Sequence, residues 1–336
     1  MRTICSTYIF VVQDKKVVMN ISIIIPAFNE EESVEKLAAE IVSILSLTEY
    51  TYEIIFIDDG SVDSTWSVIS GLHESVKRYE NYDIRGIRFR KNIGKSAALD
   101  VGFSHAQGEV IITMDADLQD DPNEIVPLYK MIKHEGYDLV SGWKKKRLDP
   151  ISKTIPTKLY NWATRIMSGI KLHDFNCGLK AYSINLVKDI QLSGEMHRYI
   201  PLLAKNQGYL KIGEKIVNHR KRTHGVTKYG GWNRFSNGLL DLISISFLNK
   251  FGKTPMHFFG LLGILSFFMG FVIAAYLTYT KIFLFQFNMT DRPLFYLGLL
   301  FMIIGSQLFL SGFLGELIIQ NKPMDSVGKI TKKLGF

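Results

Sequence analysis

The first third of the chain alternates short apolar runs with segments of helical periodicity. Runs that stay apolar without interruption are typical of strands covered on both faces, whereas apolar residues spaced three or four apart predict one-sided helices. The predicted strands are residues 21–26, 53–57, 84–89 and 109–114, and the predicted helices are residues 31–45, 64–72 and 96–106. This alternation predicts an α/β domain with a Rossmann-like, mostly parallel sheet.

The pattern changes after Gly142. Residues 153–170 place Leu159, Trp162, Ile166 and Ile170 on one helical face. Residues 233–251 repeat this amphipathic spacing and lead into a long apolar stretch. Such a face either packs on the core or lies in a membrane interface, and both interpretations stay open for residues 153–170.

Two later stretches carry no charged residue, Pro255 to Thr280 and Pro293 to Gly315. Each exceeds the ~20 apolar residues that cross a bilayer, so both predict transmembrane helices. The expected organisation is an extension (1–18), an α/β domain (19–232), a juxtamembrane amphipathic helix (233–254), two spans (255–280 and 293–316) and a basic tail (317–336). Met19 directly precedes the first strand, so we expect the protein to start there.

The net charge is +8, and the basic residues gather in clusters such as 144–147, 219–222 and 329–333. No nucleic-acid motif accompanies them, so a lipid bilayer or a lipid phosphate is the expected anionic partner. The tail is basic, whereas the segment Lys281–Arg292 between the spans holds only two basic residues. The positive-inside rule therefore predicts a multi-pass inner-membrane protein whose α/β domain is cytosolic. The two cysteines have no metal or disulfide spacing, which suits that compartment.

Six polar residues follow the ends of predicted strands: Asn29, Glu30, Asp58, Asp59, Asp115 and Asp117. Ligands of α/β sheets bind at the carboxyl ends of the strands, so we expect one site there. Asp115 and Asp117, one residue apart, predict a site for Mg²⁺ or Mn²⁺, which would neutralise a leaving diphosphate. An isolated pair of aspartates with this spacing is commonly part of a solvated turn. Here the motif extends to Pro122 and follows a second acidic turn.

The motifs together resemble a known family. They are IIIPAFNEEES (23–33), IDDGSVDST (57–65), RKNIGKSAAL (90–99), DADLQDDP (115–122), DFNCGLKAY (174–182), EMHRYIP (195–201) and RTHGVTKYG (222–230). The set is similar to family 2 glycosyltransferases of the GT-A fold. With two C-terminal spans it resembles the polyprenyl-phosphate glycosyltransferases, the bacterial relatives of dolichyl-phosphate mannose synthase. The resemblance covers residues 21 to about 320.

The resemblance implies transfer of a sugar from a nucleotide sugar, expected to be a UDP-sugar, to polyprenyl phosphate with inversion, for cell-envelope glycan modification. The implied donor-binding residues are Pro26, Asn29, Glu30, Asp58, Asp59, Lys95 and Asp115. Asp115 and Asp117 would hold the metal, and Asp117 and Asp174 would be catalytic. Two alternatives stay open: Asp58 as a turn residue, and Lys95 as a solvated lysine.

Arg198, Arg222 and Lys228 match the family's basic positions and would bind the acceptor phosphate, since arginine binds phosphate with a planar fork. Gly225 and Gly230 would let that loop close. We expect His197, Tyr199 and Cys177 to be packing residues, Cys177 within a strand. Three positions depart from the family pattern: Asp121 replaces a common proline, Thr227 a serine and Lys322 an arginine.

Asp174 matches the position usually assigned to the catalytic base. A phosphate acceptor, with a second pKa near ~6, already carries a nucleophilic oxygen at neutral pH, so little base catalysis is needed. Asp174 is therefore expected to orient substrate, to help the metal site, or to cap the turn before Cys177.

Three other functions are compatible with parts of this sequence. A processive polysaccharide synthase would carry a Q-x-x-R-W motif, which this sequence lacks. Against a non-catalytic membrane assembly partner stand the intact Asp115, Asp117 and Asp174. Against a transporter stands the lack of ionisable residues in the interior of the spans, since the nearest candidate, Glu316, lies at a span end. The sequence identifies neither the sugar nor the oligomeric state, and a homo-oligomer remains open.

Overall fold

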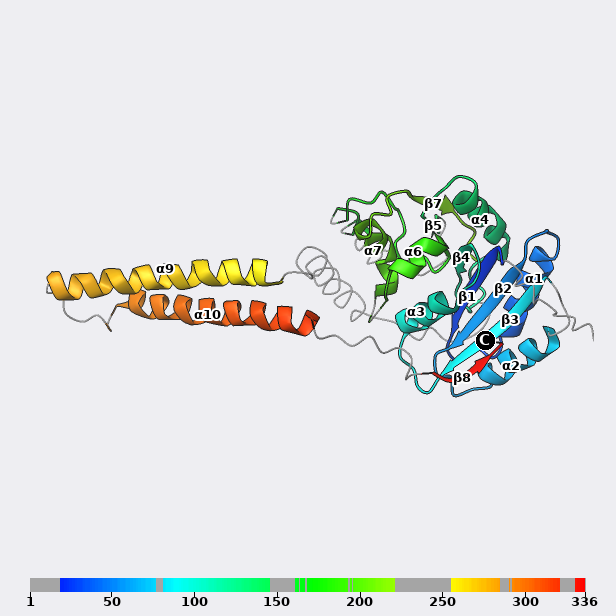
Figure 1. Cartoon of the computed structure of the whole chain (residues 1–336), viewed down its shortest axis with the longest axis horizontal. Helices are drawn as coiled ribbons and strands as arrows, with labels where there is room; N and C mark the ends of the chain where they lie inside the picture. The colour runs from blue at the N-terminus through cyan, green and yellow to red at the C-terminus, as the bar shows by residue number, and fades with distance from the viewer. Residues whose placement is uncertain are drawn as a thin grey trace, which may run out of the picture. The chain divides into compact units, whose positions relative to one another are not determined.

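A computed structural model describes residues 19–76, 81–145, 161–162, 164–166, 168–192, 194, 196–220, 255–284, 290, 292–320 and 330–335. The chain divides into two compact units (Figure 1). The first comprises Met1–Tyr229 with Ser326–Phe336, and the second is Gly230–Asp325. The extension 1–18 and the predicted helix 233–254 lie outside the described residues.

The described strands of the first unit form one eight-stranded mixed sheet, in the order β7-β5-β6-β4-β1-β2-β3-β8. Their bounds are β1 Ile21–Ala27, β2 Tyr52–Asp58, β3 Tyr82–Phe89, β4 Val110–Thr113, β5 Leu139–Trp143, β6 Lys180–Ser183, β7 Ile212–Ile216 and β8 Ile330–Leu334. The central strands β4, β1, β2 and β3 are parallel, and β5 is parallel to β7. Strand β6 runs antiparallel to β4 and β5, and β8 antiparallel to β3.

Helices cover both faces of this sheet. Their bounds are α1 Val34–Leu45, α2 Thr65–Val76, α3 Lys95–His105, η1 Pro122–Glu124, α4 Ile125–Lys133, α6 Ile184–Asp189, η2 Met196–Arg198 and α7 Ile200–Asn206. On β1, Ile23 and Ile25 pack with α1, α2 and α4, whereas Ile24, between them, packs with α3, α6 and α7. Successive strand residues point to opposite faces, so an uninterrupted apolar run serves both cores.

The predicted mostly parallel α/β domain is confirmed, and β1 to β4 lie where the apolar runs placed them. The sequence patterns did not predict β5 to β8. Strand β8 comes from the segment expected to be only a basic tail. It follows the second unit in sequence, yet it pairs with β3 through Gly86–Leu334 and Arg88–Lys332.

The second unit contains the long helices α9 (Pro255–Phe283) and α10 (Pro293–Gln320), which lie side by side (Figure 1). In the described part of the chain, these two are long and apolar enough to cross a membrane. Their contact is a glycine seam. A Cβ added at Gly263 would lie 2.7 Å from the Gly305 carbonyl oxygen, and one added at Gly305 would lie 2.6 Å from that of Gly263. Small residues allow such close backbone packing, which stabilises helix pairs in lipid.

Part of the predicted amphipathic helix 153–170 is described, and residues 161–162, 164–166 and 168 are helical. Its polar residues Thr164 and Ser168 are buried, whereas Trp162 and Ile166 are 58% and 62% exposed. Ile170, just after the helical residues, is buried. The two largest described apolar side chains of this helix therefore do not pack on the core, which favours the membrane-interface interpretation.

Candidate functional site

The polar residues that follow strand ends in the sequence do gather at the carboxyl-terminal edge of the parallel strands. Two loops there, after β1 and after β2, bind each other. Asn29, at a positive φ of 52°, donates its backbone N–H to Ser61 Oγ (2.9 Å) and accepts from Val62 N–H at its Oδ1 (3.0 Å). The Glu30 backbone N–H donates to Thr65 Oγ1 (2.8 Å). The IIIPAFNEEES and IDDGSVDST motifs thus form one rigid rim.

Asp58 is fully buried at the end of β2. Its carboxylate accepts from Ser61 N–H (2.8 Å) and lies 3.2 Å from Arg88 Nε. Of the two roles open from sequence, this geometry favours the turn residue over the nucleoside contact. Pro26, on β1, is half-buried in the same region.

Asp59 connects this rim to the start of α3. Its carboxylate oxygens accept from the backbone N–H groups of Ile93 (2.7 Å) and Gly94 (2.9 Å). Gly94 has a φ of 113°, a conformation that favours glycine, and it positions Lys95 as the first residue of α3. Burial raises the pKa of Asp59, opposed by these two hydrogen bonds.

Asp115 follows β4 and forms an ion pair with Lys95. Its carboxylate also rests on Gly178, where an added Cβ would lie 2.6 Å from Asp115 Cγ. Burial raises the pKa of Asp115, but the nearby ammonium groups of Lys95 and Lys144 outweigh it and hold the pKa at about 2. Asp115 is therefore ionised at any physiological pH.

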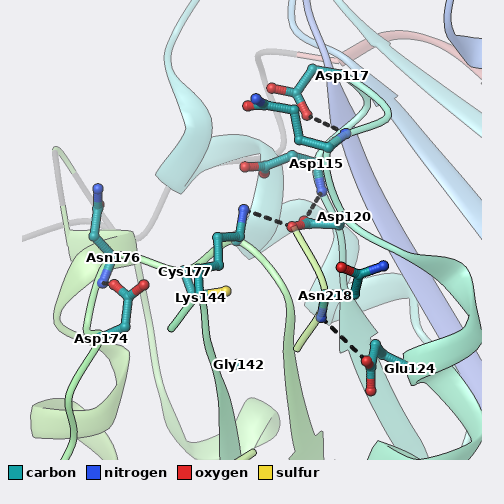
Figure 2. Close-up of polar contacts among 12 residues, drawn as sticks. Asp115, Asp117, Asp120, Glu124, Gly142, Lys144, Asp174, Asn176, Cys177 and Asn218 are labelled. Carbon is teal, nitrogen blue, oxygen red and sulfur yellow. Dashed lines mark hydrogen bonds and ion pairs between the residues drawn. The ribbon is translucent and has the colours of Figure 1, made fainter. Parts of the chain in front are cut away.

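Asp117 and Asp120 lie on the same loop as Asp115, so that three carboxylates occur together there (Figure 2). Asp117 accepts from the Gln119 backbone N–H (3.2 Å). Asp120 is buried, accepts from the Asp115 backbone N–H (3.3 Å) and pairs with Lys144 (2.8 Å). Burial, followed by the negative charges of Asp115 and Asp120, raises the pKa of Asp117 to about 6. Negative charge is in excess at Asp117, as expected where a cation binds.

Asp174 lies on the loop that leads to β6 and is 2% exposed. Its Oδ1 accepts from the backbone N–H of Asn176 (3.1 Å), which lies beside it in Figure 2. The Asp174 carbonyl accepts from Ser141 Oγ (3.1 Å). Cys177 is buried as predicted, but it precedes β6 rather than lying in a strand, because antiparallel pairing with β4 begins at Lys180. Burial raises the pKa of the Cys177 thiol to about 12, so the thiol stays protonated.

His197 and Arg198 belong to η2, which contacts the first turn of α3. His197 Nδ1 lies 3.0 Å from Ser96 Oγ, which also accepts from the His197 backbone N–H. Burial lowers the pKa of His197 well below its usual range, and the charges of Lys95 and Arg198 lower it further. Arg198 thus lies in the same cluster as Lys95. Tyr199 is fully buried, in line with a packing role. The other predicted acceptor residues, Arg222 and Lys228, lie outside the described residues.

One functional contact was not predicted from sequence. Arg220 pairs with Asp121 (2.8 Å) and with Glu40 of α1 (2.6 Å). Asn218 Nδ2 donates to Asp121 (3.1 Å), and the Arg220 backbone N–H donates to the Gln119 carbonyl (2.9 Å). The acidic loop is thus fastened to the segment that enters RTHGVTKYG. The only sequence signal was Asp121 itself, an acidic residue at an unusual position.

Comparison with known proteins identifies the family. Residues 22–190 match the model described as "Glycosyl transferase family 2". The chain is 35% identical to a dodecaprenyl-phosphate galacturonate synthase of Rhizobium johnstonii, over 91% of this chain and 90% of that protein. It is 31% identical to an undecaprenyl-phosphate 4-deoxy-4-formamido-L-arabinose transferase of Pseudomonas syringae, over 93% and 91%.

The chain therefore belongs to glycosyl transferase family 2, and its first unit is a glycosyltransferase domain of the GT-A type. Among solved structures, a glucosyl-3-phosphoglycerate synthase of Mycobacterium tuberculosis is similar, with 21% identity and a TM-score of 0.48. That similarity covers 69% of this chain and 80% of the other.

Proposed function

We propose that this enzyme transfers a sugar from a UDP-sugar to polyprenyl phosphate at the cytosolic face of the inner membrane. The observation that carries the proposal is the ionised Asp115, which pairs with Lys95. Lys95 in turn lines a pocket together with Lys180 and Arg198. The relatives named above use dodecaprenyl or undecaprenyl phosphate and match over about nine-tenths of both chains. The product would supply cell-envelope glycan modification.

The donor side would be formed by Asp115, Lys95 and the rim of Asn29, Glu30 and Asp59. Asp59 acts there through the loop that carries Lys95, because its carboxylate already accepts two backbone N–H groups. Lys95, at the first turn of α3, is the cation nearest to the expected diphosphate.

Asp115 and Asp117 fit a divalent cation such as Mg²⁺ or Mn²⁺. The raised pKa of Asp117 reflects crowded negative charge, which a cation would relieve. Within the described ranges, no group of three or more His, Cys, Asp or Glu residues is suited to hold a metal. The protein would thus offer two carboxylates, with donor phosphates and water as the remaining ligands, as Mg²⁺ commonly has. A bound cation would stabilise the charge of the leaving diphosphate.

The reaction would be a single in-line displacement. An oxygen of the acceptor phosphate bonds to the anomeric carbon, the bond from that carbon to the nucleoside diphosphate breaks, and the configuration inverts. Arg198, with Arg222 and Lys228, would hold the acceptor phosphate. Asp174 is held by the Asn176 backbone N–H, which suits a group that orients substrate, and the phosphate needs no base to become nucleophilic.

The position of β8 supports the proposed membrane topology. This strand comes after α10 in sequence, yet it belongs to the sheet of the domain that precedes α9. If α9 and α10 each cross the bilayer, the tail and the catalytic domain lie on the same side. The basic tail supports the cytosolic side, and the exposed Trp162 supports contact of this domain with lipid.

A transfer assay tests the proposal. Purified full-length protein is mixed with undecaprenyl phosphate and a panel of labelled UDP- and GDP-sugars, and label in the lipid extract is counted. We expect one UDP-sugar to label the lipid, and excess EDTA to abolish transfer. Asp117→Asn should lower turnover at least ~100-fold, about 2.7 kcal/mol of transition-state stabilisation.

Asp189→Asn is the matched control, because within the described residues the Asp189 carboxylate accepts a hydrogen bond from the exposed Tyr209 hydroxyl and lies outside the site. Folding of each variant is checked by its melting temperature. No labelled lipid with any donor would refute the proposal, and full activity in excess EDTA would refute its metal component alone.

A further inference from the structure

Lys180 is a buried cation with no carboxylate partner. It begins β6, is 3% exposed, and its ammonium donates to the Cys177 backbone carbonyl. Among the described residues, no carboxylate oxygen lies within 4.0 Å of that ammonium; Asp174 and Asp115 act on it only from farther away. A buried charge is unfavourable unless an opposite charge compensates it.

The surroundings of Lys180 add positive charge. A small pocket is lined by Lys95 of α3, Lys180 of β6, His197 and Arg198 of η2, and the loop residues Asn176 and Gly178, with Cys177 between these two. Three cations from three separate elements thus converge on one space. Burial, followed by the neighbouring charges of Lys95 and Arg198, keeps His197 neutral. Neither Asp115 nor Asp174 lines the pocket, and Asp115 is already paired with Lys95.

We infer that this pocket is an oxyanion subsite and that Lys180 is its buried binding residue. The inference rests on the proposed function. The oxyanion has two possible sources, the carboxylate of an acidic donor sugar or the phosphate of the lipid acceptor. A neutral sugar offers only hydroxyl groups and would leave the ammonium of Lys180 uncompensated. A carboxylate or phosphate supplies the missing charge and accepts charge-assisted hydrogen bonds.

The pocket borders the reacting groups, which makes either source geometrically reasonable. Gly178 of its lining contacts the carboxylate of Asp115, and Asn176 holds Asp174. Lys180 is therefore expected to act on substrate selection or acceptor binding. A purely structural Lys180 would hold the 177–180 turn and affect neither.

The test uses Lys180→Met in the full-length protein. Methionine keeps the length of the side chain and removes the buried charge, which is unfavourable where no opposite charge compensates it. Lys180→Arg tests rescue by another cation. Lys188→Gln is the matched control, because Lys188 is an exposed lysine on α6. Donor kinetics are measured with UDP-galacturonic acid and UDP-galactose, and acceptor kinetics with undecaprenyl phosphate.

If the anion is the sugar carboxylate, Lys180→Met lowers kcat/KM for UDP-galacturonic acid at least tenfold while that for UDP-galactose stays within threefold. If it is the acceptor phosphate, KM for undecaprenyl phosphate rises at least tenfold with whichever donor is used. Either result supports the subsite, and Lys180→Arg should recover most of the loss. A folded Lys180→Met with both parameters within twofold of the wild type, or with kcat alone reduced, overturns it.

A binding measurement separates this inference from the proposed function. If the wild type transfers no sugar, the proposed function fails, and the subsite is then tested with inorganic phosphate alone. Phosphate should raise the melting temperature of the wild type and of Lys188→Gln but not of Lys180→Met. An equal rise in all three proteins, or no rise in the wild type, rejects the subsite.

Discussion

Each acidic residue of the site differs from its neighbours in what compensates its charge. Asp115 pairs with Lys95 and Asp120 with Lys144, whereas Asp117 accepts the Gln119 backbone N–H. The pKa values follow this division: that of Asp115 is about 2 and that of Asp117 about 6. Of the two proposed metal ligands, Asp117 therefore has the less compensated charge, whereas Asp115 is held in position by its lysine.

His197 gives a prediction about pH and stability. Its folded-state pKa is lowered by burial, so the folded protein binds this proton less readily than the unfolded chain does. The stabilisation from keeping His197 neutral is fully present above pH ~6.5, the pKa of histidine in the unfolded chain. Below that pH, the free energy of unfolding falls by about 1.4 kcal/mol per pH unit. Between pH 7.5 and 5.5, the wild type should lose more unfolding free energy than His197→Gln, as measured by denaturant titration. Parallel pH dependences in the two proteins would contradict the assignment.

Residue types at strand ends could be predicted from the sequence, but their partners could not. Asp58 and Asp59 are adjacent, yet one binds Ser61 and Arg88 while the other fixes the loop before α3. The difference arises because successive residues point to opposite sides at the end of β2. Spacing shows that carboxylates converge, and only the fold shows which of them are already occupied.

At the scale of elements, the acidic loop and the segment after β7 form one structure. Arg220 joins Asp121 and α1, and its backbone pairs with Gln119. The hydrogen bonds from Asn123, together with Asn218 and Arg220, outweigh burial and lower the pKa of Asp121. Arg222 lies two residues after Arg220 in the sequence, so this clamp fixes the segment that precedes the proposed acceptor residues.

Breaking the clamp should affect the acceptor more than the donor. Asp121→Asn is expected to raise KM for undecaprenyl phosphate ~3- to 10-fold, roughly 0.7–1.4 kcal/mol, a modest effect because Arg220 is partly exposed. KM for the UDP-sugar should stay within twofold. Arg220→Gln should give the same phenotype, and the double variant should add little to either single one. Additive effects, or a larger change in donor KM, would argue against the clamp.

The central strands could be predicted because large apolar residues dominate them, as in ISIIIPA of β1 and VIIT of β4. Strands β5 to β7 could not, since they are four or five residues long and carry glycine, serine or lysine, as in KAYS of β6. Pairing with neighbours already in the sheet, rather than their own composition, makes them strands. The basic sequence of β8 likewise suits an edge strand, where lysine is common.

At the scale of the whole molecule, the chain leaves the catalytic domain, passes through α9 and α10, and returns to the same sheet as β8. The glycine seam holds the two helices together through close backbone contact. Because of this path, the membrane topology can be predicted from the fold as well as from the distribution of charged residues. The path predicts that residue 290, between the two helices, lies on the external side of the cell membrane.

Cysteine labelling in intact cells checks this topology. In a Cys5→Ser background, where Cys177 is buried, Thr290→Cys should react with a membrane-impermeant maleimide before lysis. Val62→Cys, at a position 89% exposed on the catalytic domain, should react only after lysis. The reverse order would place the catalytic domain outside, and labelling of both before lysis would exclude a spanning hairpin.

The central claim is that this site joins the anomeric carbon of a sugar to an oxygen of polyprenyl phosphate in one displacement. The most direct measurement is NMR of the purified lipid product made from an α-linked UDP-sugar. The account predicts coupling between phosphorus and the anomeric carbon, which shows a sugar–phosphate bond, together with β configuration. A product with retained α configuration, or with the sugar attached to anything other than the lipid phosphate, would contradict it.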